Sequence, residues 1–116
     1  MTQARRDLHS TEFGIWLREQ PEIDSALGYV ASNLDYIWSN YKTGDWMLIE
    51  EKRHNGEVKF YQKKLFERIH KLCVGSEGYH GFHVLVFQNT SPEDGKIFLD
   101  YREITRQGLL DFLRFK

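Results

Sequence analysis

The sequence is poor in cysteine, in proline and in long hydrophobic runs. Cys73 is the one cysteine of the chain, so an internal disulfide is impossible. No apolar run approaches the roughly 20 residues of a membrane span, and no apolar h-region of a signal peptide stands near the start. These features exclude disulfide-stapled secreted scaffolds and membrane-spanning proteins. We expect a protein of a reducing compartment, either cytoplasmic or nucleoid-associated, that makes no membrane contact.

A large excess of charge of either sign is also missing. Lys and Arg number 16 against 17 Asp and Glu, for a formal net charge of -1. Such a chain has no global basic field, so any nucleic acid must be held by a local patch. The 116 residues include only 2 prolines and no low-complexity segment, and 41% are hydrophobic. We therefore predict a single globular domain over residues 1–116 with a loose N-terminus at residues 1–7.

Hydrophobic periodicity predicts alternating helices and strands. Ser10 or Thr11 can cap a short helix up to residue 19, with Phe13, Trp16 and Leu17 as its apolar stripe. Three strands are expected at residues 28–31, 33–38 and 46–52, with Gly44 in the last hairpin turn. A helix over 58–73, strands at 82–87 and 96–101, and a helix over 107–115 complete the predicted order.

The predicted helix over 58–73 is the most strongly amphipathic of the chain. Its apolar positions have helical spacing and predict the side that packs on the sheet: Val58, Tyr61, Leu65, Ile69 and Leu72. Gln62 lies among them, so its amide should face the sheet and need a hydrogen-bond partner there. The run 82–87 is continuously apolar and predicts a strand covered on both faces.

Three ionisable residues on neighbouring strands form the candidate catalytic group. Glu50 and Lys52 are two residues apart, so their side chains should share one face of a strand. Asp35 stands within the preceding predicted strand, where its propensity is poor. If the hairpin loop is Thr43–Gly44 or 42–45, paired residue numbers sum to 87, and Asp35 lies opposite Lys52. The three groups would then lie within roughly 5 to 8 Å of each other.

Two carboxylates on a half-covered sheet need a compensating positive charge. Mg²⁺ takes oxygen ligands from one or two carboxylates, retains several waters and binds substrate phosphate. Asp35 and Glu50 offer such ligands, and Lys52 can orient or help to deprotonate a water and stabilise charge on an attacked phosphorus. The residues therefore point to metal-assisted phosphoryl chemistry.

This pattern resembles the D…(D/E)xK signature of the PD-(D/E)XK nuclease superfamily. Asp35 followed by Glu50-Glu51-Lys52 carries the resemblance, which extends over about residues 11–87. It implies an α/β, restriction-endonuclease-like αβββαβ core, a mixed sheet flanked by helices, here with an extra C-terminal strand and helix. Glu12 matches the glutamate that members place on the first helix, and Gln62 matches a glutamine on the helix after the signature. The proline often found before the aspartate is absent.

The resemblance implies an Mg²⁺- or Mn²⁺-dependent endonuclease that hydrolyses the phosphodiester bonds of nucleic acid, here DNA, by a metal-activated water. Asp35, Glu50 and the backbone carbonyl of Glu51 would surround the metal, and Lys52 would act at the water. Glu12 and Gln62 complete the implied catalytic set. For contacts to the nucleic-acid backbone, the local basic residues are the candidates: Arg53, Lys59, Lys63 and Lys64.

Several simpler interpretations stay open at this point. Glu50 and Lys52 also fit an ordinary solvated strand end, Glu12 a favourable charge at a helix N-terminus, and the lysines a solvated helix face. The chain can be a catalytically inactive member of the same fold that binds nucleic acid or protein, or an unrelated α/β interaction protein. A small chain presents little nucleic-acid surface, which favours a homodimer or a helper protein as partner.

Overall fold

A computed structural model describes residues 11–116, which divide into two compact units. The boundary lies between Asn33 and Leu34, and each unit is described by itself. The expected loose segment 1–7 lies outside the described residues, and the prediction of a single domain stays a prediction. No helix in the described part of the chain is long and apolar enough to cross a bilayer.

The first unit consists of one α-helix and two short 3₁₀ helices. Helix α1 spans Glu12–Glu19, and its N-cap Thr11 accepts a hydrogen bond from the Gly14 N–H, which confirms the predicted helix and one of its two predicted caps. The 3₁₀ helices η2 and η3 follow at Pro21–Ile23 and Ser25–Leu27. Phe13 and Trp16 are exposed and stack on each other at a centroid distance of 6.1 Å.

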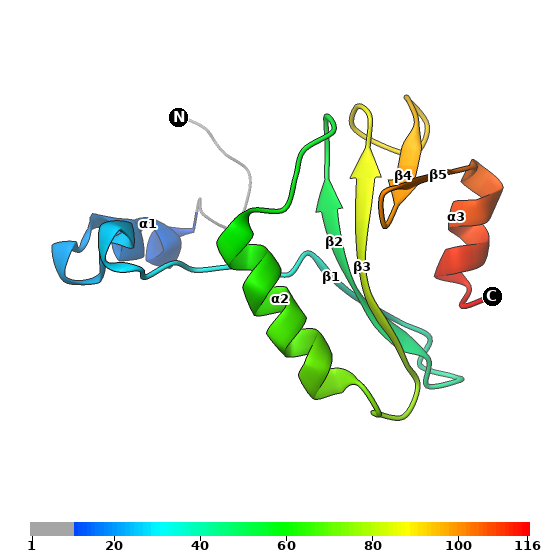
Figure 1. Ribbon diagram of the computed structural model, residues 1–116, viewed down its shortest axis with the longest axis horizontal. Coiled ribbons are helices and arrows are strands. Elements are labelled where there is room, and N and C mark those ends of the chain that lie inside the picture. Colours follow the sequence, from blue (N-terminus) through cyan, green and yellow to red (C-terminus); the bar gives the residue numbers. More distant parts are fainter. Residues whose placement is uncertain (1–10) are drawn as a thin grey trace. The chain divides into compact units, whose positions relative to one another are not determined.

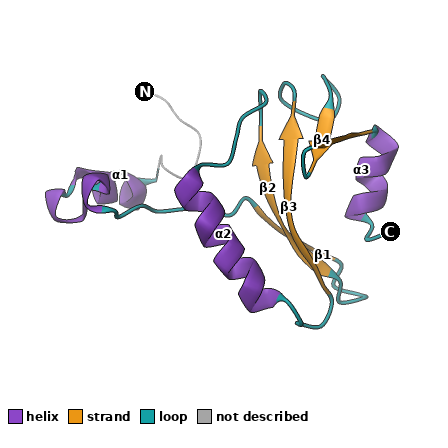
Figure 2. Cartoon of the chain, in the orientation of Figure 1, coloured by secondary structure: helices purple, strands orange, loops and turns teal. Residues whose placement is uncertain are grey.

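The predicted strand over residues 28–31 is wrong. Gly28 ends η3 in the left-handed conformation, with φ 100°, and the chain has no regular structure from there to Asp35. Figure 2 shows this stretch as loop. Tyr29 and Val30 are both exposed. The local β propensity of such a short run yields a strand only when a neighbouring strand supplies hydrogen-bond partners, which residues 28–31 do not have here.

The second unit, Leu34–Lys116, is built on a five-stranded mixed sheet with strand order β1-β2-β3-β4-β5. Its strands are β1 (Tyr36–Ser39), β2 (Trp46–Lys52), β3 (Tyr79–Phe87), β4 (Ile97–Leu99) and β5 (Arg102–Ile104). Strands β2 and β3 are parallel and are joined by helix α2, Phe60–Cys73, while the other neighbours are antiparallel. The unit is therefore α/β, as expected.

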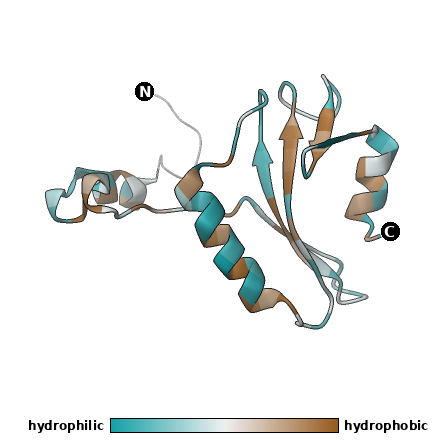
Figure 3. Cartoon of the chain, viewed as in Figure 1, coloured by the Kyte–Doolittle hydropathy of each residue, from teal (hydrophilic) through white to brown (hydrophobic). Residues whose placement is uncertain are grey.

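Helices cover both faces of this sheet, with α2 on one side and α3, Arg106–Leu113, on the other (Figure 1). The buried cluster on the α3 side comprises Met47, Ile49, Leu85, Phe87, Ile97 and Leu109. On the α2 side the buried Phe66 ring lies 4.9 Å from the Phe82 ring. Strand β3 is hydrophobic toward its C-terminal end, whereas the end of β2 is hydrophilic (Figure 3). The prediction of a central strand covered on both faces is confirmed.

Helix α2 begins two residues later than predicted and presents a different side to the sheet. Its inward positions are the buried Phe66 and the half-buried Gln62, Ile69, His70 and Cys73. Tyr61, Leu65 and Leu72 are exposed, so the prediction that they face the sheet is wrong, and Val58 precedes the helix. The large Phe66 ring fills the space against Phe82, which rotates the neighbouring Leu65 outward.

The C-terminal part differs from the prediction in one strand. The expected strand 96–101 is limited to Ile97–Leu99, because Asp100 and Tyr101 have φ of 50° and 71° and form a tight turn. The turn leads into β5, which the sequence pattern did not reveal. The final helix α3 begins after the N-cap Thr105 and ends at Leu113, two residues earlier than expected.

Candidate functional site

The end of β2 brings Glu50 and Lys52 to the α2 side of the sheet. Ile49 belongs to the core under α3, so its neighbour Glu50 points the opposite way, and Lys52 follows on the same side. Lys52 Nζ lies 3.2 Å from Glu50 Oε2, which confirms that the two side chains share a face. Glu50 is only 2% exposed and is the one buried charged residue within residues 11–116.

Asp35 lies opposite this pair, but not in the predicted register. Tyr36 pairs with Ile49 and Ser39 with Trp46, so paired numbers sum to 85 rather than 87. Extension of the ladder by one residue places Asp35 opposite Glu50 instead of Lys52. The loop is six residues long, 40–45, because the Asn40 side chain accepts from the Lys42 and Thr43 N–H groups and widens the turn. The loop length is even, as predicted, so the three residues still share one face.

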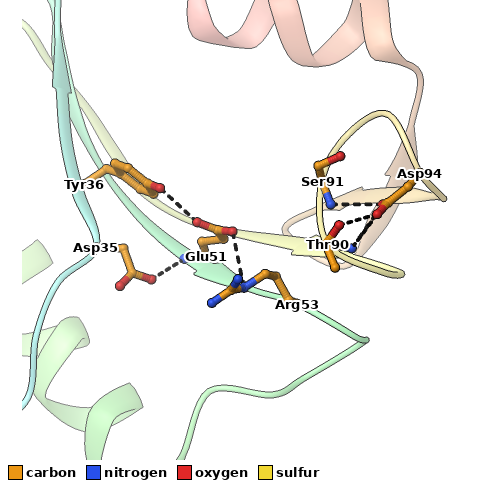
Figure 4. Close-up of polar contacts among 7 residues, drawn as sticks. All are labelled: Asp35, Tyr36, Glu51, Arg53, Thr90, Ser91 and Asp94. Atoms are coloured by element: carbon orange, nitrogen blue, oxygen red, sulfur yellow. Dashed lines mark hydrogen bonds and ion pairs between the residues drawn. The ribbon is translucent and has the colours of Figure 1, made fainter. Parts of the chain in front are cut away.

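Asp35 immediately precedes β1 and is exposed, so its predicted position inside a strand is wrong. Its Oδ2 accepts a hydrogen bond of 2.8 Å from the Glu51 N–H (Figure 4). The carboxylate thus takes the place of a backbone acceptor where the β1 ladder ends. This bond fixes Asp35 beside the Glu50-Glu51 segment without a strand around it.

The electrostatics of the site are dominated by Glu50. Burial raises the pKa of its carboxyl group, and the negative charge of Asp35 raises that pKa further, while Lys52 opposes both effects. The net pKa remains above the ordinary value of 4.5. One ammonium group therefore does not fully compensate for two neighbouring carboxylates. The group retains an unmet preference for positive charge.

Two unpartnered polar atoms of the second unit lie in the layer between the sheet and α2. The buried side-chain oxygens without a hydrogen-bond partner among the described residues are Ser32 Oγ, Glu50 Oε1 and Gln62 Oε1. Glu50 faces α2, and Gln62 lies on the sheet-facing side of α2, one turn before Phe66. The predicted inward position of Gln62 is confirmed, but the partner expected for its amide oxygen is missing. A buried acceptor is costly unless a ligand satisfies it.

The residues present fit a hard divalent cation. Oxygen atoms are the ligands that Mg²⁺ prefers, and the site offers the carboxylates of Asp35 and Glu50, with one Glu50 oxygen buried and unpartnered. The main-chain carbonyl of Glu51 is a third oxygen in the same segment. Within residues 11–116 no group of three or more His, Cys, Asp or Glu side chains is arranged to hold a metal. The site therefore offers two carboxylates, and any third protein ligand would come from the main chain.

The Glu51 side chain points to the opposite face of the sheet. Its Oε1 accepts a hydrogen bond of 3.0 Å from the Tyr36 hydroxyl, and Arg53 Nε lies 3.9 Å from its Oε2 (Figure 4). The bond to Glu51 raises the pKa of the Tyr36 phenol. Sequence reasoning missed Tyr36, although the predicted strand over residues 33–38 would have placed its side chain on the face opposite to that of Asp35.

The other predicted site residues are exposed. Glu12 opens α1 in the unit Met1–Asn33, so its predicted part in the catalytic group stays a prediction. Arg53 and Lys59 belong to the connection between β2 and α2, and Lys63 and Lys64 to the first turns of α2. Their side chains are exposed to solvent. This exposure is compatible both with a phosphate-binding surface and with an ordinary solvated helix face.

The rings of the two histidines in β3 are each bound to a carboxylate. His80 Nε2 lies 2.8 Å from Asp45 Oδ1, and His83 Nδ1 lies 2.8 Å from Asp100 Oδ2. His83 Nε2 also bonds to the His80 carbonyl. Both rings are therefore used in structural contacts.

Comparison with known proteins adds no further identification: no protein-family model, curated protein or solved structure matches this chain.

Proposed function

We propose that this protein is a metal-dependent nuclease that hydrolyses phosphodiester bonds of DNA, with a restriction-endonuclease-like core. The observation that carries the proposal is the buried Glu50, whose Oε1 has no partner while its Oε2 contacts Lys52. A carboxylate held in this way, opposite a second carboxylate, is a costly arrangement that a bound cation would relieve. A solvated strand end would not need to bury it.

Asp35, Glu50 and the Glu51 carbonyl would hold the cation. When bound, Mg²⁺ would lower the pKa of a water and neutralise charge on the phosphate. Lys52 is 22% exposed in its side chain, so its ammonium is held by Glu50 and remains accessible to a substrate phosphate or an attacking water. There it would orient the water and stabilise the additional negative charge on the attacked phosphate. The Gln62 amide would supply a further polar contact from α2.

Cleavage of plasmid and branched DNA in Mg²⁺ or Mn²⁺ tests the proposal. We expect wild-type cleavage, and a loss of at least about 100-fold in rate for Lys52→Ala and for Asp35→Asn. Thr43→Ala is the matched control, because Thr43 lies in the same hairpin but at the far end from the site. EDTA should abolish wild-type cleavage.

Equal activity of wild type, Lys52→Ala and Asp35→Asn would indicate a contaminating nuclease and contradict the proposal. A chain that binds DNA with all carboxylates intact but never cleaves it would instead be an inactive member of the fold. Circular dichroism of each variant separates loss of chemistry from loss of folding.

A further inference from the structure

The first turns of α2 present exposed aromatic rings among lysines. Phe60 is 74% exposed and Tyr61 is 44% exposed. Lys59, Lys63 and Lys64 stand beside them, and residues 58–66 contain no acidic side chain. Positions i, i+3 and i+4 share one side of a helix, so Phe60, Lys63 and Lys64 form a single patch, here called the Phe60 patch.

The Phe60 patch has a charge and shape suited to one kind of ligand. Lys64 Nζ lies 5.3 Å from the centroid of the Phe60 ring, which keeps a cation at one side of the ring without burying it. An apolar protein partner would have to desolvate the three neighbouring lysines, at a considerable cost. A polyanion that also carries flat rings would use the lysines and the aromatic side chains together.

We propose that the Phe60 patch binds single-stranded nucleic acid, with an unpaired base stacked on Phe60 and phosphates on Lys63 and Lys64. Aromatic platforms flanked by cations bind single strands in this way without reading their sequence. Bases in a duplex are stacked on one another and do not offer a free face. This inference rests on the proposed function and gives it a substrate class: nucleic acid with unpaired bases, such as ends, flaps or junctions.

The patch adjoins, along the chain, a residue of the proposed catalytic set. Gln62, with its buried unpartnered oxygen, follows Phe60 and Tyr61 and points to the sheet while they point to solvent. One helical turn therefore presents an inward group to the sheet and an outward platform to solvent. A base held on Phe60 would keep the adjoining phosphates close to this end of α2.

Binding of a fluorescein-labelled 12-nucleotide oligo(dT) and of a 12-base-pair duplex of two separate strands without overhangs, in EDTA to prevent cleavage, tests the inference. We expect tighter binding of the single strand, and a loss of about tenfold for Phe60→Ala with duplex affinity unchanged within about twofold. Phe60→Trp should restore single-strand binding, and 2-aminopurine fluorescence in the oligonucleotide should be quenched by wild type but not by Phe60→Ala. Tyr41→Ala is the control, since Tyr41 is 88% exposed in the β1–β2 loop.

An equal loss of single-strand and duplex binding for Phe60→Ala, or no loss at all, would overturn the inference. Self-association that Phe60→Ala abolishes in light scattering, without nucleic-acid binding, would assign the patch to a second copy and also overturn it. Stacking that persists while no substrate is ever cleaved would retain the inference and reject the proposed nuclease activity. The two proposals therefore fail by different observations.

Discussion

At the scale of single residues, Glu50 combines burial, a neighbouring carboxylate and an unpartnered oxygen. Each of these features disfavours its negative charge, whereas the ion pair with Lys52 and a hydrogen bond from the main chain of Asp35 favour it. A raised pKa in the folded state means that the ionised carboxylate opposes folding at neutral pH. Under the proposed metal-dependent function, this loss of stability would be offset when a cation binds.

The substitution Glu50→Gln should separate these two effects. It keeps the shape of the side chain, removes the buried charge and leaves Lys52 able to reach water. We expect the free energy of unfolding at pH 7 to rise by about 1 kcal/mol, measured by urea denaturation. Addition of Mg²⁺ at ten times its Kd should stabilise wild type by about 1.4 kcal/mol and leave Glu50→Gln unchanged. Equal stabilisation of both proteins by Mg²⁺ would exclude Glu50 as a ligand.

At the scale of elements, β3 is tied to the β4–β5 turn by His83 and Asp100. The Val84 N–H donates to Asp100 Oδ1, and the Asp100 N–H donates to the Val84 carbonyl. Both His83 ring nitrogens face acceptors, the Asp100 carboxylate and the His80 carbonyl, so both bonds are made only by the protonated ring. Loss of the proton removes one donor.

Stability should therefore depend on pH through this pair. Burial lowers the pKa of His83, but the bonds to Asp100 and the His80 carbonyl outweigh it and raise the pKa above 6.5. Burial acts to raise the pKa of Asp100, which the His83 bond nevertheless holds below 3.8. The pair's contribution is full between about pH 4 and 6.5. It is lost as pH rises through the folded pKa of His83, or falls through that of Asp100.

Urea denaturation between pH 5 and pH 9 measures this dependence. We expect the unfolding free energy of wild type to decrease above pH 6.5, and the decrease to be much smaller in His83→Gln. Asp100→Asn should also reduce this dependence of the unfolding free energy on pH, because it removes the charged partner of His83. His80→Gln is the control at the neighbouring exposed histidine, whose substitution should leave the His83 contribution in place. An unchanged slope in His83→Gln would disprove this linkage.

At the scale of the whole molecule, all the buried hydrophobic residues found within residues 11–116 belong to the second unit. The cluster under α3 runs from Met47 to Leu109, and Phe66 completes the other side of the sheet. No residue of the first unit's described part is buried. We expect a chain that begins at Leu34 to unfold cooperatively, with an unfolding free energy within about 1 kcal/mol of the full chain.

Near-ultraviolet circular dichroism and urea denaturation of residues 34–116 check this expectation. In the full chain, Met47→Ala should cost about 2 to 5 kcal/mol because it opens a cavity, whereas Phe13→Ala should change stability by no more than about 0.5 kcal/mol. A truncated chain without fixed tertiary structure would show instead that residues 1–33 are part of the same folding unit.

The sequence predicted most reliably those segments whose hydrophobic pattern is compatible with only one secondary structure and one set of bounds. Strand β2 was placed at its observed bounds, because an apolar run ends in three charges. The shared face of Asp35, Glu50 and Lys52 followed from the even loop. The register did not, because it depends on how the Asn40 side chain caps the turn. The inward side of α2 depended on the competition between Leu65 and Phe66, which only packing decides.

The unpartnered oxygens of Glu50 and Gln62 were beyond prediction for a related reason. A sequence pattern shows which residues face inward but not whether the opposite surface supplies a donor. Likewise, residues 28–31 have the composition of a strand but no neighbour to pair with. Long-range partners, rather than local preference, decided each of these points.

At position 51, the main chain and the side chain make separate contacts, and mutagenesis can remove only the second. Its main-chain N–H holds Asp35 on one side of the sheet, while its side chain serves Tyr36 and Arg53 on the other. Replacing the side chain cannot delete the amide, so an alanine scan would score Glu51 as dispensable to the site. Proline is the exception among the encoded residues, since it alone lacks the amide hydrogen. A position 51 that accepts every residue except proline would therefore still be one whose main-chain N–H holds Asp35 in place.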